Sequence, residues 1–412
     1  MLAANSQLSD KDRKIGTFLV VLYLFCYYVR PQEIIPGLGE IRIVGVLFLI
    51  TTIWGFYHIR QYVFKTPLII IIILGVVFFL SGIGAVNVGS YKLAIKFIFE
   101  FFPQCLAVYL VFDSKERIIK LIHLWGLIYF FMALITIKNG GLGPGDFTWD
   151  PNDASLALSM GIPLCLYVLR FLDISTRQKW FYLGTLALLI AAIIVTNSRG
   201  GFLGLIAVIL IIWWFSRKRL KIAMVSTVLA IALSSILFSI LPDDYLKEME
   251  SINDPTDETR VERLRTWEIA WVMYKDNIIL GVGGGNFAYN AGHYQRQTSW
   301  WTGNEKSLQG RLTHSVYFQV LADLGTLGTL IYLYVMFILP LRLNKLRKRI
   351  GEDTEEQKLV KMFAMYLIVA MGGFAIAGAF ISVAYYPHIP IWITMYAILL
   401  RYVTKNRESL FN

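Results

Sequence analysis

Residues 67–86 read PLIIIIILGVVFFLSGIGAV and contain no charged side chain. A helix of this length crosses a hydrocarbon core of about 30 Å. The run is continuously apolar, whereas the strands of a membrane barrel alternate between apolar and polar residues. The stretch therefore predicts an all-α membrane protein.

Similar runs recur along the chain, in which 56% of the 412 residues are hydrophobic and 16% are charged. The mean hydropathy of +0.58 is typical of a chain that lies in lipid. We expect a polytopic bundle of about 12 transmembrane helices, of which the second and fourth are short enough for one to be re-entrant. The expected spans are residues 16–29, 43–57, 67–86, 97–112, 118–137, 152–169, 180–196, 201–215, 222–240, 314–340, 362–382 and 389–403.

The basic residues predict the orientation of these spans. With the N-terminus inside, most Lys and Arg residues fall in the cytoplasmic connections, including the cluster at 342–349 and the C-terminal tail. This bias predicts that both termini are cytoplasmic. It also accounts for the net charge of +11 without a nucleic-acid partner.

One connection, residues 241–313, is much longer than the others and falls on the non-cytoplasmic side. Connections of this length are usually functional or form a small domain. We therefore divide the chain into a transmembrane bundle (1–240), a periplasmic loop with short helices (241–313) and C-terminal spans (314–412), within one integrated domain.

The middle of this loop, residues 258–274, predicts a helix. Val261, Leu264, Trp267 and Trp271 recur at helical spacing, which indicates an amphipathic helix. Its tryptophans favour a position at the membrane interface. The glycines at 281–285 then end the helical pattern.

The side chains that are candidates for chemistry lie at the predicted outer ends of the spans. Arg199 stands between small residues at the start of a span, where a guanidinium beside a helix N-terminus suits a phosphate. His314 opens the tenth span and is the best candidate for a general base, because its pKa lies near neutrality. His388, before the last span, is the weaker alternative.

Secondary candidates lie nearby in the sequence. Arg263 and Arg265 belong to the loop helix, where neighbouring glutamates explain most of their pattern as surface pairing. Arg311 precedes His314, and Asp323 falls inside the tenth span, where a carboxylate is expected to face the bundle interior.

Several residue patterns argue against cofactors. The three cysteines lie inside apolar runs, and no cluster of His, Cys or carboxylates has metal-ligand spacing. Asn286 occupies the place of the last glycine of a dinucleotide fingerprint, and no Walker-type lysine motif occurs. We therefore expect neither a metal nor a nucleotide cofactor.

Taken in order, these motifs resemble the O-antigen ligase family of bacterial envelope proteins. The resemblance rests on residues 198–201 (SRGG), on Arg265-x-Trp267 followed by residues 281–287 (GVGGGNF), and on residues 314–325 (HSVYFQVLADLG). Residues 28–33 (YVRPQE) and 385–390 (YYPHIP) resemble the O-glycosylation ligase branch associated with exosortase systems. Asp323 departs from the pattern, because a glutamate is expected there.

The resemblance implies a GT-C-like fold in the bacterial inner membrane. It also implies periplasmic, metal-independent transfer of a glycan from undecaprenyl pyrophosphate to an acceptor hydroxyl. The acceptor is lipid A-core in the ligases, a protein side chain in the O-oligosaccharyltransferases and a growing glycan in the polymerases. By motif position, Arg199 and Arg265 would bind the donor pyrophosphate and His314 would assist the acceptor.

A transporter or lipid flippase is the alternative from another class, since about 12 spans suit it equally well. A transporter is expected to place polar residues near the midplane of the membrane. In this sequence they gather at the outer ends of the spans, which favours chemistry at the membrane surface.

Overall fold

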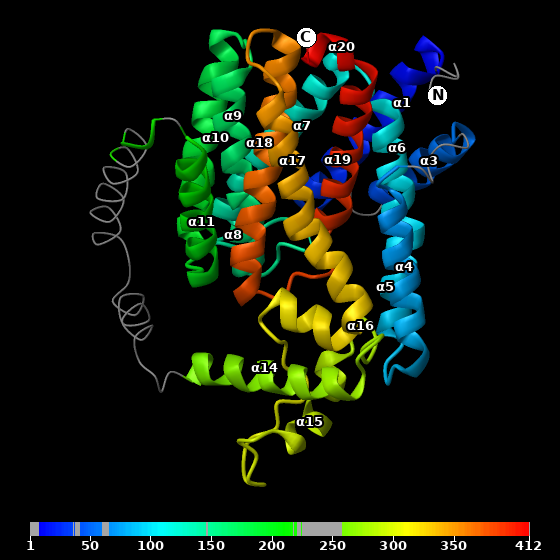
Figure 1. The fold of residues 1–412 in the computed structure, drawn as a ribbon, viewed down its shortest axis with the longest axis vertical. Coiled ribbons are helices and arrows are strands. Elements are labelled where there is room, and N and C mark those ends of the chain that lie inside the picture. The colour runs from blue at the N-terminus through cyan, green and yellow to red at the C-terminus, as the bar shows by residue number, and fades with distance from the viewer. Residues whose placement is uncertain are drawn as a thin grey trace.

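The structure is a computed structural model that describes residues 8–35, 37, 42–59, 66–145, 147–216, 218–220, 224 and 258–411. Within these residues every regular element is a helix, which confirms the predicted all-α class (Figure 1).

The first group of helices precedes the long loop. It comprises α1 (Asp10–Val29), α2 (Pro31–Ile34), α3 (Ile43–Tyr57), α4 (Ile69–Ser81) with the 3-10 turn Gly82–Gly84, α5 (Gly89–Ile95), the π-helical turn Lys96–Phe101, α6 (Phe102–Val111), α7 (Lys115–Lys138), α8 (Pro151–Ser159), α9 (Gly161–Phe171), α10 (Thr176–Val195) and α11 (Arg199–Phe215).

The second group contains the loop helices and the C-terminal spans. It comprises α14 (Glu258–Asp276), α15 (Phe287–Tyr294), the 3-10 turn Gln295–Gln297, α16 (Val316–Leu333), the π-helical turn Tyr334–Ile338, α17 (Leu339–Arg349), α18 (Glu355–Ala377), the 3-10 turn Gly378–Phe380, α19 (His388–Lys405) and α20 (Arg407–Phe411).

Among the described residues, 6 helical segments are long and apolar enough to cross a membrane. The chain is therefore a multi-pass membrane protein. Three shorter apolar helices, Ile43–Tyr57, Ile69–Gly84 and Arg199–Phe215, accompany them. The total of about 12 spans stays a prediction, as does the division into three segments. The expected ninth span at 222–240 lies outside the described residues except at residue 224.

The fourth span is longer than predicted, because its helix runs from Gly89 to Val111 rather than from residue 97. Its first turns were not predicted from hydropathy because they contain the charged residues Lys92 and Lys96. Pro103 lies within it, directly after the π-helical turn Lys96–Phe101. A π-turn locally rearranges the hydrogen-bond ladder, so the helix continues through the proline.

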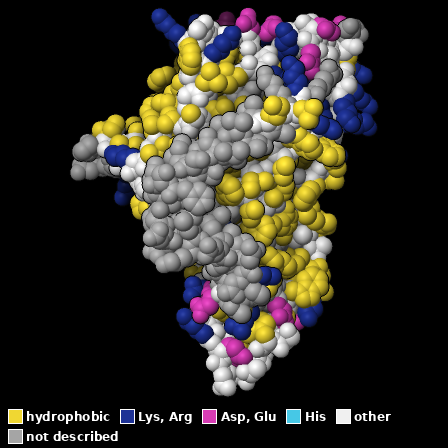
Figure 2. All heavy atoms as spheres, turned by 90° about the vertical axis from the view of Figure 1, so that its left-hand side faces the viewer, with side chains coloured by type: hydrophobic (Ala, Val, Ile, Leu, Met, Phe, Trp, Pro, Cys, Tyr) yellow, Lys and Arg dark blue, Asp and Glu magenta, His cyan; other side chains and the backbone are white. Residues whose placement is uncertain are grey.

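Charged side chains separate toward the two ends of the molecule. Beside the grey atoms, the visible flank between the ends is mainly hydrophobic, while Lys, Arg, Asp and Glu gather mostly above and below it (Figure 2). Both labelled termini lie at one end, and α14 runs across the opposite end with α15 beyond it (Figure 1). We call these the terminal end and the α14 end; which of them faces the cytoplasm stays a prediction.

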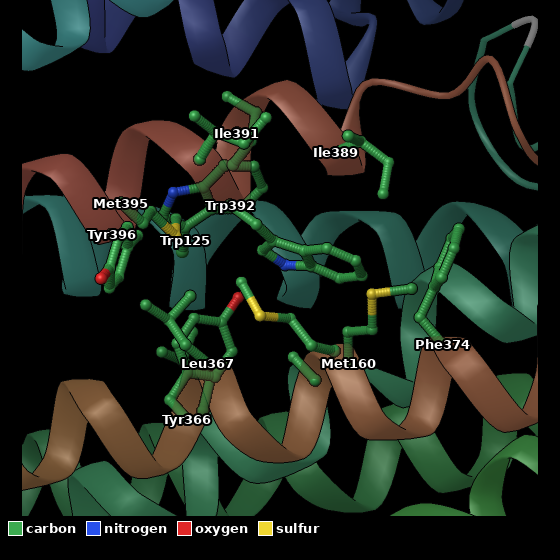
Figure 3. Close-up of a cluster of buried hydrophobic side chains, with 14 of the residues drawn as sticks. Trp125, Met160, Tyr366, Leu367, Phe374, Ile389, Ile391, Trp392, Met395 and Tyr396 are labelled. Atoms are coloured by element: carbon green, nitrogen blue, oxygen red, sulfur yellow. The ribbon is translucent and has the colours of Figure 1, made fainter. Parts of the chain in front are cut away.

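The interior of the bundle is built around α18, which has buried residues along its whole length, as expected for a helix that is hydrophobic on all sides. Trp392 of α19 is 2% exposed and points toward this helix, beside Phe374 and Met160 (Figure 3). The rings of Trp392 and Phe374 meet edge to face, with centroids 5.1 Å apart. This packing supports the loop of residues 381–387, which precedes α19 at the α14 end.

Candidate active site

The predicted loop helix is confirmed as α14, but a different face of it packs against the protein. Its buried positions are Thr266, Ile269, Ala270, Val272 and Met273, most of which form a helical stripe on the side that meets α16 and α15. Leu264 and Trp271, which the sequence pattern placed on the apolar face of an interfacial helix, are 52% and 48% exposed. Thr266 and Ala270 contribute small buried side chains on this side of α14, and the ring of Trp267 stacks on that of Phe318 in α16 with centroids 5.1 Å apart.

His314 lies where α14 meets the start of α16. Its backbone has a φ of 49°, a left-handed conformation that is unfavourable for residues other than glycine. The preceding Thr313 is held firmly, because its carbonyl oxygen accepts from Trp267 Nε1 at 2.9 Å. Its hydroxyl also lies 3.2 Å from the hydroxyl of Ser382. Strained backbone persists where its surroundings fix it and often marks functional positions.

The environment of His314 favours a neutral imidazole. Burial lowers the pKa of His314 below its usual 6.5, and the positive charges of Arg263 and Arg311 lower it further. Glu262 and Asp150 act in the opposite direction without reversing the shift. Arg311 also pairs with Glu262 at 3.2 Å. A neutral imidazole at pH 7 can accept a proton, as a general base must.

The two loop-helix arginines point to different surroundings. Residues two positions apart on an α-helix are separated by about 200° around its axis. Arg263 shares its face with Thr266 and Trp267, which contact Thr313, and its charge acts on His314. The guanidinium of Arg265 instead lies over the ring of Trp300, 4.6 Å from its centroid.

The structure thus brings Arg263 beside His314 and turns Arg265 toward Trp300. Motif matching ranked Arg265 first and left Arg263 as a secondary candidate. The one sequence signal for Arg263 is that it precedes Trp267 by four residues, one helical turn.

Arg199 is the first residue of α11, and the chain before it is tied to α8. Ser198 caps α11 by accepting from the backbone N–H of Gly201 at 2.9 Å. The same hydroxyl donates to Asn152 Oδ1 at 2.6 Å. A Cβ at Gly201 would lie 1.9 Å from the hydroxyl of Ser155, so only glycine allows this approach of the two helices.

Two connections join the start of α11 to His314. Asn152, which binds Ser198, also donates its backbone N–H to Asp150 at 2.8 Å, and the charge of Asp150 acts on His314. On the other side, the helix start at Gly200 packs against Ile381, next to the Ser382 that contacts Thr313. The start of α11, which carries Arg199, is thus linked through neighbouring contacts to His314, beside which Arg263 lies.

His388 occupies a different kind of environment. Its ring lies among Phe147, Phe374 and Trp392, with centroid separations of 6.1, 6.0 and 5.9 Å. Its Nδ1 is buried and has no hydrogen-bond partner among the described residues. An imidazole surrounded by aromatic rings is typical of packing, so His314 remains the better candidate base.

Asp323 is buried and holds the glycine segment, residues 281–285, in place. Its carboxylate accepts from the backbone N–H groups of Gly285 at 3.0 Å and Phe287 at 2.7 Å, and from the hydroxyl of Tyr385. The backbone around it also binds this segment, since Val282 N–H donates to Ala322 O at 3.0 Å. The structure therefore gives Asp323 a positioning role between α16 and the segment that follows α14.

Replacing Asp323 with asparagine is expected to destabilise the protein by about 1–3 kcal/mol. All the partners of the carboxylate are donors, so the amide nitrogen of asparagine would face a donor and leave it unpaired. Thermal unfolding in detergent measures the effect, and Asp276→Asn at the exposed end of α14 is the matched control. Equal unfolding temperatures for all three proteins would show that the carboxylate does not hold the segment.

No group of three or more His, Cys, Asp or Glu side chains within the described ranges could hold a metal ion. The three cysteines are buried and free. The charged groups that act on His314 are two arginines, Arg263 and Arg311, and two carboxylates, Asp150 and Glu262.

Residues 184–333 match the family model described as O-antigen ligase. This range includes the start of α11, the whole of α14 and the first part of α16. Arg199, Arg263, Arg265 and His314 all lie inside it. No curated protein matches the chain in sequence.

Proposed function

We propose, from the O-antigen ligase domain that the chain carries over residues 184–333, that it is a membrane glycosyltransferase. It would move a glycan from undecaprenyl pyrophosphate to an acceptor hydroxyl, with lipid A-core as the acceptor. The family implies a glycan ligase or polymerase that acts on lipid-linked glycans. The observation that supports the proposal is that Arg263 lies beside His314, and that both residues and Arg199 fall within the matched range.

The reaction needs charge stabilisation more than it needs an acid. The acceptor oxygen forms a bond to the anomeric carbon of the glycan, while the bond from that carbon to the pyrophosphate oxygen breaks. Undecaprenyl pyrophosphate leaves with the electron pair, so negative charge develops on its phosphate oxygens. Guanidinium groups beside these oxygens lower the barrier, because they bind the transition state more strongly than the substrate.

Arg199 and Arg263 are the cations that we assign to this charge. Arg199 lies at the N-terminus of α11, where backbone N–H groups and the helix dipole also favour an anion. Arg263 lies beside His314. Arg265, which the resemblance implies, stacks on Trp300 in the structure, and we assign it a supporting role in holding residues 299–300 against α14.

His314 would take the proton of the acceptor hydroxyl as that oxygen attacks. Its neutral form is favoured by burial and by Arg263. A direct attack from the side opposite the pyrophosphate inverts the anomeric configuration. After transfer the imidazolium returns its proton to water or to the departing pyrophosphate, which restores the base.

The membrane position supports a lipid-borne donor. The part of the flank to the right of the grey atoms in Figure 2 is hydrophobic down to the α14 end, so a polyprenyl tail can lie along the spans while its pyrophosphate reaches the arginines. We propose that the α14 end is periplasmic in the bacterial inner membrane and that both termini are cytoplasmic. This orientation follows from the basic connections, as the positive-inside rule requires.

The decisive experiment supplies purified protein in nanodiscs with an undecaprenyl-pyrophosphate-linked oligosaccharide and three separate acceptors. We expect a glycosidic product with lipid A-core. Product only on a second lipid-linked glycan would make the protein a polymerase, and product only on a peptide would make it a protein O-oligosaccharyltransferase. Movement of the donor across the bilayer without any product would identify a transporter and overturn the proposal.

The pH dependence of transfer is expected to report the lowered pKa of His314. The base is active when neutral and is lost as the imidazole is protonated, so activity falls on the acid side with a midpoint below pH 6.5. Arg263→Gln removes a positive charge that lowers the pKa, so the residual activity should have its midpoint shifted upward. Rates measured from pH 4.5 to 8 test this. A wild-type midpoint above 6.5 would contradict it.

A further inference from the structure

A cavity of about 360 Å³ lies beside the glycine segment, between the end of α4 and the helices of the loop. Its walls come from Leu80 to Gly84, from residues 277–282 after α14, and from α15. The volume lies near the lower end of the range of small-molecule sites, about 300–1,000 Å³. None of the predicted site residues lines it, so the reaction centre does not account for it.

Four polar side chains line this cavity: Ser81, Asn277, Asn290 and Tyr294. The hydroxyl of Ser81 donates to Phe78 O at 2.9 Å. The amide nitrogen of Asn277 donates to Met273 O at 3.0 Å and to the hydroxyl of Tyr294 at 2.9 Å. The amide nitrogen of Asn290 donates to Asn286 O at 2.9 Å. Both amides thus use their nitrogens, and within the described part of the chain neither carbonyl oxygen accepts a hydrogen bond.

The lining therefore offers two amide carbonyl acceptors, the hydroxyl oxygen of Ser81 as a third acceptor, and one hydroxyl donor, since the hydroxyl of Tyr294 already accepts from Asn277. It contains no Lys, Arg, Asp or Glu side chain, so it has no group that would balance a charged ligand. Leu80, Ile83 and Val282 add apolar surface. A ligand that complements this lining has hydroxyl groups along one edge, to bind the polar side chains, and C–H groups on one face, to pack against the apolar ones.

We propose that the cavity binds one uncharged sugar unit of the glycan, an inference that rests on the proposed glycosyl transfer. An acyl chain of a lipid or detergent would leave the two carbonyl oxygens and the hydroxyl without partners, which costs free energy in a desolvated site. A pyranose ring satisfies them with its hydroxyl groups.

The position of the cavity indicates which sugar it holds. Its wall at Val282 is hydrogen-bonded to Ala322 of α16. Ala322 follows Ser315, the neighbour of His314, by seven residues, which is roughly 10 Å along a helix. The sugar in the cavity is therefore not the one whose anomeric carbon reacts, but one further along the same chain of sugars.

Saturation-transfer NMR with the full-length protein in nanodiscs tests this binding without any turnover. The probes are the methyl glycosides of glucose, galactose and N-acetylglucosamine, with the methyl glycoside of glucuronic acid as the charged comparison. We expect at least one neutral glycoside to bind, and the glucuronide to bind about tenfold more weakly or not at all.

Two variants place the binding in the cavity. Tyr294→Phe removes one hydroxyl and is expected to weaken binding about tenfold, whereas Tyr289→Phe on the exposed side of α15 should not. Gly84→Leu adds a side chain where a Cβ meets no atom within 4 Å, and it should abolish binding by filling the space. Gly184→Leu in α10 is its matched control, because a Cβ there also meets nothing within 4 Å.

Three outcomes would overturn the proposal. They are absence of binding by every neutral glycoside, binding that Tyr294→Phe and Gly84→Leu leave unchanged, and preferential binding of the charged glycoside. An unfolding temperature equal to that of the wild type confirms that a variant is folded. If Gly84→Leu unfolds, Tyr294→Phe still tests the proposal, because it removes only one oxygen atom. The binding assay uses neither donor nor acceptor, so it tests the cavity alone. If the proposed function is wrong, the transfer assay fails whatever the binding assay shows.

Discussion

Arg263→Ala is expected to lower kcat/KM for glycan transfer about 100-fold or more, because removing one preorganised charge from a transition-state site costs about 10²–10³ in rate. The charge of Arg263 acts on His314, so the same guanidinium can lie beside the pyrophosphate when the acceptor meets the base. Arg199→Ala is expected to cause a loss of the same size. Arg265→Ala should cost about tenfold or less, since it removes a stacking contact with Trp300.

The comparison between Arg263→Ala and Arg265→Ala is the sharpest part of this test, because the two residues belong to the same helix and differ in the face they occupy. Arg263→Lys keeps the charge but not the planar fork, so it should recover only part of the activity. A larger loss in Arg265→Ala than in Arg263→Ala would reverse our assignment. It would show that Arg265 leaves Trp300 and binds the donor.

His314→Gly is expected to lose transfer activity by about 10²–10⁴-fold without loss of stability. The imidazole is the only base that we assign, so its removal leaves the acceptor hydroxyl to lose its proton to water. The backbone of His314 is left-handed, with a φ of 49°. Glycine adopts this conformation without the penalty of about 1–2 kcal/mol that a side chain carries.

This combination separates chemistry from structure at one position. A residue retained only for packing would lose stability and activity together when its side chain is removed. Arg42→Gly is the control, because Arg42 is also left-handed, with a φ of 47°, and precedes α3. Its replacement should leave transfer unchanged. Activity near wild type in folded His314→Gly protein would exclude His314 as the base.

The helical fold could be predicted from the sequence because hydropathy acts locally. Each apolar run must satisfy its own backbone hydrogen bonds in lipid, and only a helix does so within one segment. For the same reason, basic and acidic residues could be placed at the ends of spans. Arg199 and His314 were found in this way, as polar side chains at positions where an apolar span begins.

The errors in the prediction have a common physical origin. A helix periodicity shows which residues share a face, but not which face meets the protein. In α14 the sequence pattern placed Leu264 and Trp271 on the apolar face, but it did not show that Thr266 and Ala270 would be the buried side of the helix. That choice decides whether Arg263 or Arg265 points to His314.

Other features depend wholly on tertiary structure. Asp323 binds backbone groups more than thirty residues earlier in the chain and a tyrosine sixty-two residues later. The sugar cavity forms only where α4, the turn after α14 and α15 come together. The sequence by itself determined the helices and the ends at which charge collects, because lipid acts on every segment alone. The tertiary structure decided which arginine, which carboxylate and which cavity serve the site, because those depend on contacts between segments far apart in the chain.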